Sequence, residues 1–135
     1  MDRELAFGVE DPTALTSNRR AFTIMVRNYM FRLVQLFALE KEDRLAELLD
    51  YLDEVPDFGA ILDDYFDEYD DIDSGPEARG PEYFRLGDTD SRLWSVRQII
   101  KDPVGDHAYQ FVATVDLDAS DEAGEVRLSD LRVEY

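Results

Sequence analysis

The chain has no cysteine, a single histidine and two lysines, and it has no long run of apolar residues. The absence of cysteine excludes disulfides and thiolate metal sites. With His107 alone, a triple-histidine metal centre is impossible and a Ser–His–Asp triad has one candidate base. No apolar run approaches the roughly 20 residues of a membrane-spanning helix, and the first residues lack the basic and apolar regions of a signal peptide. We therefore expect a cytoplasmic protein without membrane contact.

Positive charge is also scarce. The 135 residues carry 32 acidic side chains against 14 basic ones, and the formal net charge is −18. All basic residues except Lys41 and Lys101 are arginines. Such a surface repels nucleic-acid phosphates unless the arginines gather on one side. We therefore expect no direct binding of nucleic acid, and we attribute the charge to an acidic proteome rather than to an acidic functional surface.

Motifs for catalysis are missing as well. Neither lysine lies in a glycine-rich phosphate loop, and the chain has no serine nucleophile elbow or metal-spaced cluster. Residues 67–70 have the letters Asp-Glu-x-Asp of a helicase Walker B box, but the residues before them follow helical rather than strand spacing. The sequence therefore predicts no ATPase, no metal, no cofactor and no catalytic residue.

The first half of the chain predicts helices. A hydrophobic share of 44% indicates one folded domain over residues 15–135, after a loose lead-in at residues 1–14. Pro and Gly interrupt all periodicity at residues 70–81, where we expect a loop. Apolar residues at helical spacing predict three helices before this loop, at residues 15–39, 44–55 and 57–69.

The last third of the chain predicts antiparallel strands. Trp94 and Gln98 share one face of an alternating segment, and Gly105 lies in a turn. Because Leu128 and Leu131 are out of phase, we expect a bulge near Ser129–Asp130. Helices followed by strands predict an α+β domain with two or three N-terminal helices packed on a four-stranded antiparallel sheet. The order is that of a cystatin-like or NTF2-like roll.

One acidic stretch, "VDLDASDEAGEVRL" at residues 115–128, invites comparison with a calcium loop. An EF-hand loop beginning at Asp116 would need Gly at its sixth position and Glu at its twelfth. The sequence has Asp121 and Arg127 there, and the stretch lies between two alternating segments. We therefore predict a hairpin connection at residues 118–124, with Gly124 at positive φ.

The first helix supplies a candidate interface. Its second side carries arginines seven residues apart beside apolar side chains, a mixture common at protein interfaces. Internal ion pairs between the arginines and the acids of the third helix are an equal alternative. The candidate interface residues are Arg20, Ile24, Arg27, Phe31 and Val34.

A second candidate site is a pocket within an NTF2-like cone. Core packing is the better interpretation of its aromatic rings. Asp106 precedes the histidine, and many NTF2-like enzymes use an Asp–His pair, but consecutive strand residues point to opposite faces. We favour a histidine in a turn. The pocket residues of this alternative are Trp94, His107, Tyr109 and Phe111.

Three stretches occur in order: "NRRAFTIMVRNYMFRLVQL", "GPEARGP" and "WSVRQIIKDPVGDHAYQFVATVDLDASDEAGE". Together they resemble the C-terminal segment of an uncharacterised domain that follows the helicase lobes in actinobacterial DEAD/DEAH-box helicase-like proteins. The resemblance spans residues 15–126, carries over no functional residue, and lacks the lobes themselves. It implies a non-enzymatic accessory or protein-interaction domain that meets a helicase-like protein in cis or in trans, or a second copy of itself. The alternative is an NTF2-like domain that binds or hydrolyses a small ligand.

Overall fold

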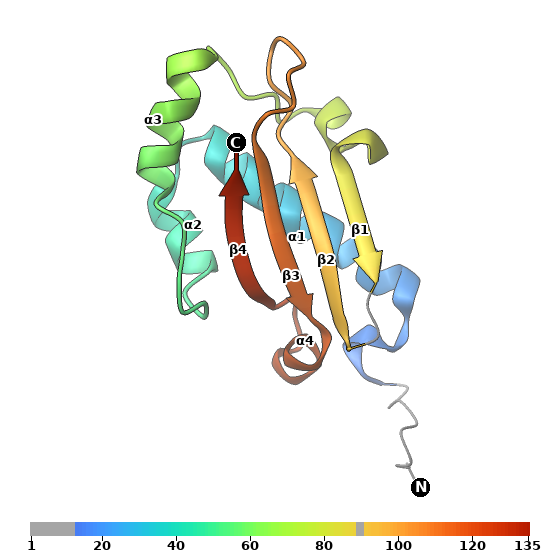
Figure 1. Ribbon diagram of the computed structural model, residues 1–135. Helices are drawn as coiled ribbons and strands as arrows, with labels where there is room; N and C mark the ends of the chain where they lie inside the picture. The colour runs from blue at the N-terminus through green and yellow to red at the C-terminus, as the bar shows by residue number, and fades with distance from the viewer. Residues whose placement is uncertain (1–12, 89–90) are drawn as a thin grey trace, which may run out of the picture.

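The computed structural model describes residues 13–88 and 91–135, so most of the expected lead-in at residues 1–14 lies outside the described residues. It shows a four-stranded sheet with helices along one face and one edge (Figure 1). The strands pair antiparallel in chain order, which confirms the predicted α+β class; the cystatin-like or NTF2-like roll stays a prediction. The strands are β1 (Phe84–Asp88), β2 (Leu93–Ile99), β3 (Gln110–Asp116) and β4 (Leu128–Glu134).

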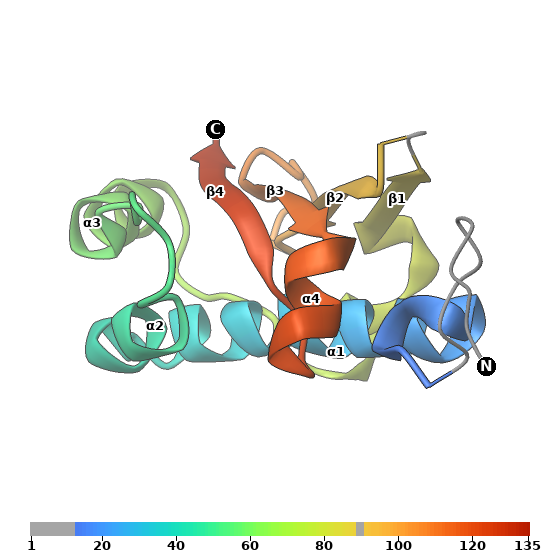
Figure 2. The same ribbon diagram turned by 90° about the horizontal axis from the view of Figure 1, so that it is seen from below.

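Helix α1 (Arg19–Ala38) lies across one face of the sheet (Figure 2). The Asn18 side chain caps it by accepting a hydrogen bond from the Ala21 N–H. Apolar residues three and four positions apart then form the stripe that faces the strands. Within the described residues, no helix covers the opposite face of the sheet (Figure 2). The stripe includes Phe22, Val26, Met30, Leu33 and Phe37, all buried.

Two shorter helices follow, α2 (Glu42–Leu48) and α3 (Phe58–Glu68). Helix α3 lies beside β4, at the edge of the sheet (Figures 1 and 2). The helix predicted at residues 44–55 is wrong in extent, because α2 ends at Leu48. Acidic residues crowd the chain after that point, where the negative end of the helix dipole disfavours them. The Asp57 side chain then caps α3 by accepting from the Ala60 N–H.

The loop predicted at residues 70–81 contains a short 3-10 turn, η2 (Pro76–Arg79), and leads into a second, η3 (Pro81–Tyr83). Each turn begins with proline, whose fixed φ suits a first helical position. Ala78 is buried, which anchors η2 against the core. The anchored turn places Arg79 over the Phe31 ring of α1.

The core lies between α1 and the inner face of the sheet. Alternate residues of β2 and β3 point inward, as predicted, and Phe111 packs edge-on against Phe37 of α1 with ring centroids 5.3 Å apart. Trp94 lies on the same face, next to Phe22 at 5.2 Å. Gln98 is the polar member of this face and is 2% exposed.

The predicted bulge in the last strand is confirmed. Thr114 pairs with Asp130, but the next residue, Val115, pairs with Leu128. Ser129 is therefore the extra residue, and it restores the inward direction of Leu128 and Leu131.

The turn between β2 and β3 is organised by a buried carboxylate. Asp102 is 3% exposed, and it accepts backbone N–H groups from Val104 at 3.1 Å, Asp106 at 2.9 Å and His107 at 2.7 Å. Gly105 has a φ of 78°, which glycine adopts without the steric cost of a side chain. The predicted turn role of Gly105 is confirmed.

The hydropathy of the helices bears on membrane contact. Among residues 13–88 and 91–135, no helix combines the length and the apolar character needed to cross a bilayer.

Candidate functional site

The candidate interface on α1 divides into a buried and an accessible part. Phe31 is 3% exposed and Val34 is also buried, so neither can meet a partner as predicted. The part of the second side that contains Phe31 is covered within the domain by the guanidinium of Arg79, which lies 4.9 Å above the Phe31 ring. Ile24 is 51% exposed, and Arg20 is exposed beside it.

The alternative prediction, ion pairs between the α1 arginines and α3, is also wrong for Arg27. Its guanidinium stacks 5.1 Å from the Phe84 ring of β1, and its Nη2 donates a hydrogen bond to the Arg79 carbonyl at 3.1 Å. Helix α3 instead lies along β4, where Asp64 accepts a hydrogen bond from the Tyr135 hydroxyl. The partners of Arg27 are thus a ring and a carbonyl.

Arg79, in η2, contacts α1 through both its guanidinium and its carbonyl. Its Nη2 donates to the amide oxygen of Asn28, one turn of helix from Phe31. Within the described residues, neither Arg27 nor Arg79 has a carboxylate within ion-pair distance, although the chain has 32 acidic residues. We call Arg20, Ile24, Arg27 and Arg79 the arginine surface.

A small hollow opens beneath the arginine surface. It has a volume of about 40 Å³ and is lined by Arg27, Phe31, Arg79, Phe84 and Gln98. The Gln98 side chain donates from Nε2 to the Tyr83 carbonyl at 3.0 Å. Its oxygen, Oε1, has no donor among the described residues. The hollow therefore combines two guanidinium groups with a buried amide oxygen.

The alternative pocket is filled by its own rings. Trp94 packs on Phe22, and Phe111 packs on Phe37, so these two rings are core residues rather than walls of a cavity. Tyr109 contacts Tyr65 with centroids 5.0 Å apart. Burial, together with nearby acids, raises the pKa of Tyr109 to about 12, so its hydroxyl remains protonated at neutral pH.

His107 lies in the turn, as favoured from the sequence. Its ring contacts Tyr83 with centroids 5.1 Å apart, and its backbone has a φ of 56°. The neighbouring Asp106 carboxylate accepts a hydrogen bond from the Tyr69 hydroxyl at 2.7 Å. These contacts hold the turn in place and do not bring an Asp–His pair to a cavity.

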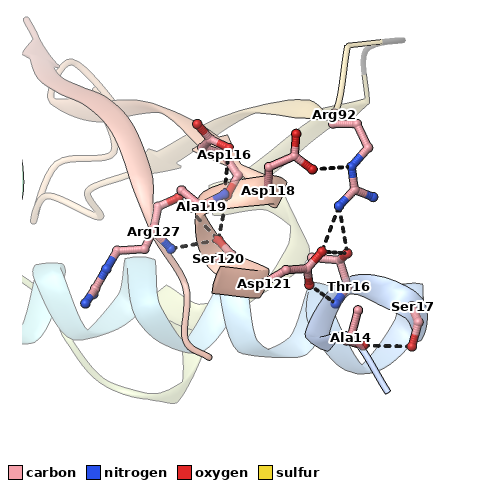
Figure 3. Close-up of polar contacts among 10 residues, drawn as sticks. All are labelled: Ala14, Thr16, Ser17, Arg92, Asp116, Asp118, Ala119, Ser120, Asp121 and Arg127. Carbon is pink, nitrogen blue, oxygen red and sulfur yellow. Dashed lines mark hydrogen bonds and ion pairs between the residues drawn. The ribbon is translucent and has the colours of Figure 1, made fainter. Parts of the chain in front are cut away.

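The acidic stretch at residues 116–125 connects the antiparallel strands β3 and β4, which confirms the predicted hairpin connection. The connection is formed by a helix, α4 (Leu117–Ala123), rather than by a turn (Figure 3). Asp116 caps the helix by accepting from the Ala119 N–H at 3.0 Å. Gly124 has the predicted positive φ, 75°, but it adopts this value as the residue that ends a helix. The sequence around it thus contained both the start and the stop signal of α4.

The carboxylates of α4 bind other parts of the chain. Asp121 accepts hydrogen bonds from the Thr16 N–H and hydroxyl, both at 2.8 Å. It also accepts from Arg92 Nη2 at 2.7 Å, while Arg92 Nε donates to Asp118 at 2.8 Å (Figure 3). The stretch therefore ties the start of the domain to the sheet. Across residues 13–88 and 91–135, no cluster of three or more His, Asp or Glu side chains is placed to hold a metal ion.

Comparison with known proteins gives one match. Residues 2–133 match the family model described as domain of unknown function DUF3516. The chain belongs to the DUF3516 family. No curated protein and no solved structure matches the chain.

Three residues of the DUF3516 arginine surface and hollow were missed from the sequence: Arg79, Phe84 and Gln98. Arg79 lies in a loop without periodicity, 52 residues from Arg27, so no spacing rule connects them. Gln98 did carry a signal, because it is a polar residue on the apolar face of β2. A buried amide at such a position requires hydrogen-bond partners, and its surroundings are therefore a place to look for a site.

The polar network of α4 makes a testable contribution to the stability of this DUF3516 domain. Replacing Asp121 with Ala removes three hydrogen bonds, one of them to a charged guanidinium. We expect the free energy of unfolding to fall by about 1–3 kcal/mol, measured by urea denaturation. Glu122→Ala, at an exposed neighbour on the same helix, should change it by less than about 0.5 kcal/mol. Equal effects of the two substitutions would contradict a structural role for Asp121.

Proposed function

We propose that this chain is a non-enzymatic protein-interaction domain that serves as an accessory to a DEAD/DEAH-box helicase-like protein, in cis or in trans. The interaction part of the proposal is supported by the arginine surface. It presents exposed Ile24 among arginines that have no carboxylate within ion-pair distance in the described part of the chain. Arginine and apolar side chains together are typical of protein interfaces.

The helicase part of the proposal is supported by the sequence resemblance alone. The three stretches that carry the resemblance include most of α1 and the η2 turn, which together form the arginine surface. The proposed docking element therefore lies in the part of the sequence that carries the resemblance to helicase-like proteins. The NTF2-like alternative is less favoured, because Trp94 and Phe111 are packed against core rings.

The double substitution Arg20→Glu and Ile24→Glu tests this proposal. Both side chains are exposed, and an acid in the first turn of α1 is compatible with the helix dipole. We expect the melting temperature to stay within about 2 °C, since such surface changes alter stability little. Affinity capture from the native host, followed by mass spectrometry, should recover a helicase-like ATPase with the wild-type domain and lose it with the variant.

Arg32→Glu provides the matched control, since Arg32 is an exposed arginine of the same helix outside the arginine surface. This variant should retain the helicase-like protein. The proposal fails if the double variant captures the same ATPase as the wild type, or if the wild-type domain captures no helicase-like protein. Salt-sensitive binding to RNA or DNA that disappears in the double variant would show direct nucleic-acid contact instead.

A further inference from the structure

Both arginines of the hollow combine a stacked ring with the lack of a carboxylate partner among the described residues. Arg27 and Arg79 bond to neutral acceptors, the Arg79 carbonyl and the Asn28 amide, and each guanidinium covers a phenyl ring. Two other arginines of the described residues also lie over an aromatic ring, Arg19 over Trp94 and Arg127 over Tyr51, but each of these has a carboxylate within 4 Å.

The stacking of the two guanidinium groups leaves donors unused. A guanidinium carries five N–H donors in a planar fork, and each of these arginines uses one nitrogen, Nη2, in the hydrogen bonds described above. The phenyl rings below Arg27 and Arg79 limit the positions that the side chains can adopt. Two oriented forks with free donors suit a carboxylate, which accepts such bonds in pairs.

Gln98 adds a second and independent observation. Its side chain is 98% buried, lines the hollow, and turns its Nε2 towards the carbonyl oxygens of Tyr83 and Ile99. This leaves Oε1 as a buried acceptor without a donor among the described residues. Buried polar atoms are nearly always paired, so Oε1 calls for a donor that the described residues do not supply.

We propose that the hollow binds an aspartate or glutamate carboxylate of an acidic segment in the partner protein. Arg27 and Arg79 donate to the carboxylate, and the Gln98 Oε1 accepts a hydrogen bond from an N–H of the same segment or from the O–H of a water that the segment holds in place. This inference rests on the proposed function, because it names the chemistry that the arginine surface recognises. Ile24, one turn of α1 before Arg27 and 51% exposed, provides the apolar contact.

A protein carboxylate fits this site better than a nucleic-acid backbone. At physiological ionic strength charges interact over about 8 Å, so a single carboxylate senses the local arginines more than the distant acids. A nucleic-acid strand carries a phosphate on every nucleotide and would extend from three arginines onto a surface of net charge −18. The hollow, at about 40 Å³, also has room for a carboxylate group rather than a base.

Nuclear magnetic resonance titration of the full chain with a synthetic octapeptide rich in glutamate tests the proposal. We expect saturable shifts of the side-chain N–H signals of Arg27, Arg79 and Gln98. Arg27→Gln with Arg79→Gln keeps a polar side chain at each position but removes both charged guanidinium groups, and it should weaken binding by at least about tenfold. Arg32→Gln with Arg44→Gln removes the same charge elsewhere and should change the affinity by less than about twofold.

Several results would overturn the inference. The titration of the wild-type domain does not depend on whether a variant folds. An absence of saturable shifts at Arg27, Arg79 and Gln98 in that titration contradicts a carboxylate site. So does an equal loss of affinity in the two double variants, or tighter binding of inorganic phosphate or a single-stranded oligonucleotide at the same residues. Capture of the helicase-like protein without peptide binding would refute the carboxylate site and leave the proposed function standing. Peptide binding without capture of the helicase-like protein would refute the proposed function and leave the carboxylate site standing.

Discussion

Replacing Trp94 with Ala should lower the free energy of unfolding by about 3–5 kcal/mol, the cost of removing a large aromatic side chain from a packed core. Trp94 is buried on the inner face of β2. Its ring packs against Phe22, and the guanidinium of Arg19 lies 4.9 Å from its centroid. The substitution therefore leaves a cavity at the contact between α1 and the sheet, and we expect a large shift of the urea denaturation midpoint with the fold retained.

Val104→Ala is the control for Trp94, since Val104 is an apolar residue exposed in the turn between β2 and β3. It should change the free energy of unfolding by less than about 0.5 kcal/mol. A loss of similarly small size for Trp94→Ala would place the ring at the surface and contradict the packing of α1. Because Trp94 is the only tryptophan of the chain, its fluorescence reports directly on that contact in the wild type.

The second large effect is expected at Asp102. Burial alone would raise the pKa of this carboxyl, but the backbone N–H groups of Asp106, His107 and Val104 outweigh burial and hold the pKa below its ordinary value. The ionised carboxylate therefore stabilises the folded state. Asp102→Asn should cost about 2–3 kcal/mol at pH 7, in the range of hydrogen bonds to a charged group, as measured by urea denaturation.

The pH dependence follows from the same carboxylate. Since the pKa is lower in the folded than in the unfolded state, the stabilisation is complete above the unfolded value of about 4 and is lost as the pH falls below it. Asp102→Asn should therefore flatten the fall in stability between about pH 5 and pH 2. Asp53→Asn, at an exposed carboxylate, should keep the wild-type slope. An unchanged slope in the Asp102 variant would show that this carboxylate does not carry the effect.

The regular part of the fold could be predicted from the sequence because apolar periodicity reports directly on burial. The spacing of Phe22, Val26 and Leu33 identified α1, and the phase change between Leu128 and Leu131 identified the bulge at Ser129. Helix α4 was missed because seven residues are too few for a periodic signal. Its cap, Asp116, and its terminating residue, Gly124, also suit a hairpin turn.

The candidate site could be predicted in part. The seven-residue spacing of Arg20 and Arg27 correctly placed them on one side of α1. Whether that side was free depended on a contact with η2, more than 50 residues away, and such a contact leaves no trace in local spacing. For this reason Phe31 was expected to be exposed, while Arg79, which covers it, was not expected at the site.

The bond between Thr16 and Asp121 has a consequence for the order in which the chain folds. The strands of the sheet are sequential neighbours, so each can pair with the next across a short connection. The Thr16 contact, in contrast, joins residues 105 positions apart, and closing so long a loop costs more chain entropy than any turn of the sheet. We expect this contact to form after the strands have assembled and to open before they separate. Its loss should then speed unfolding and leave the folding rate nearly unchanged.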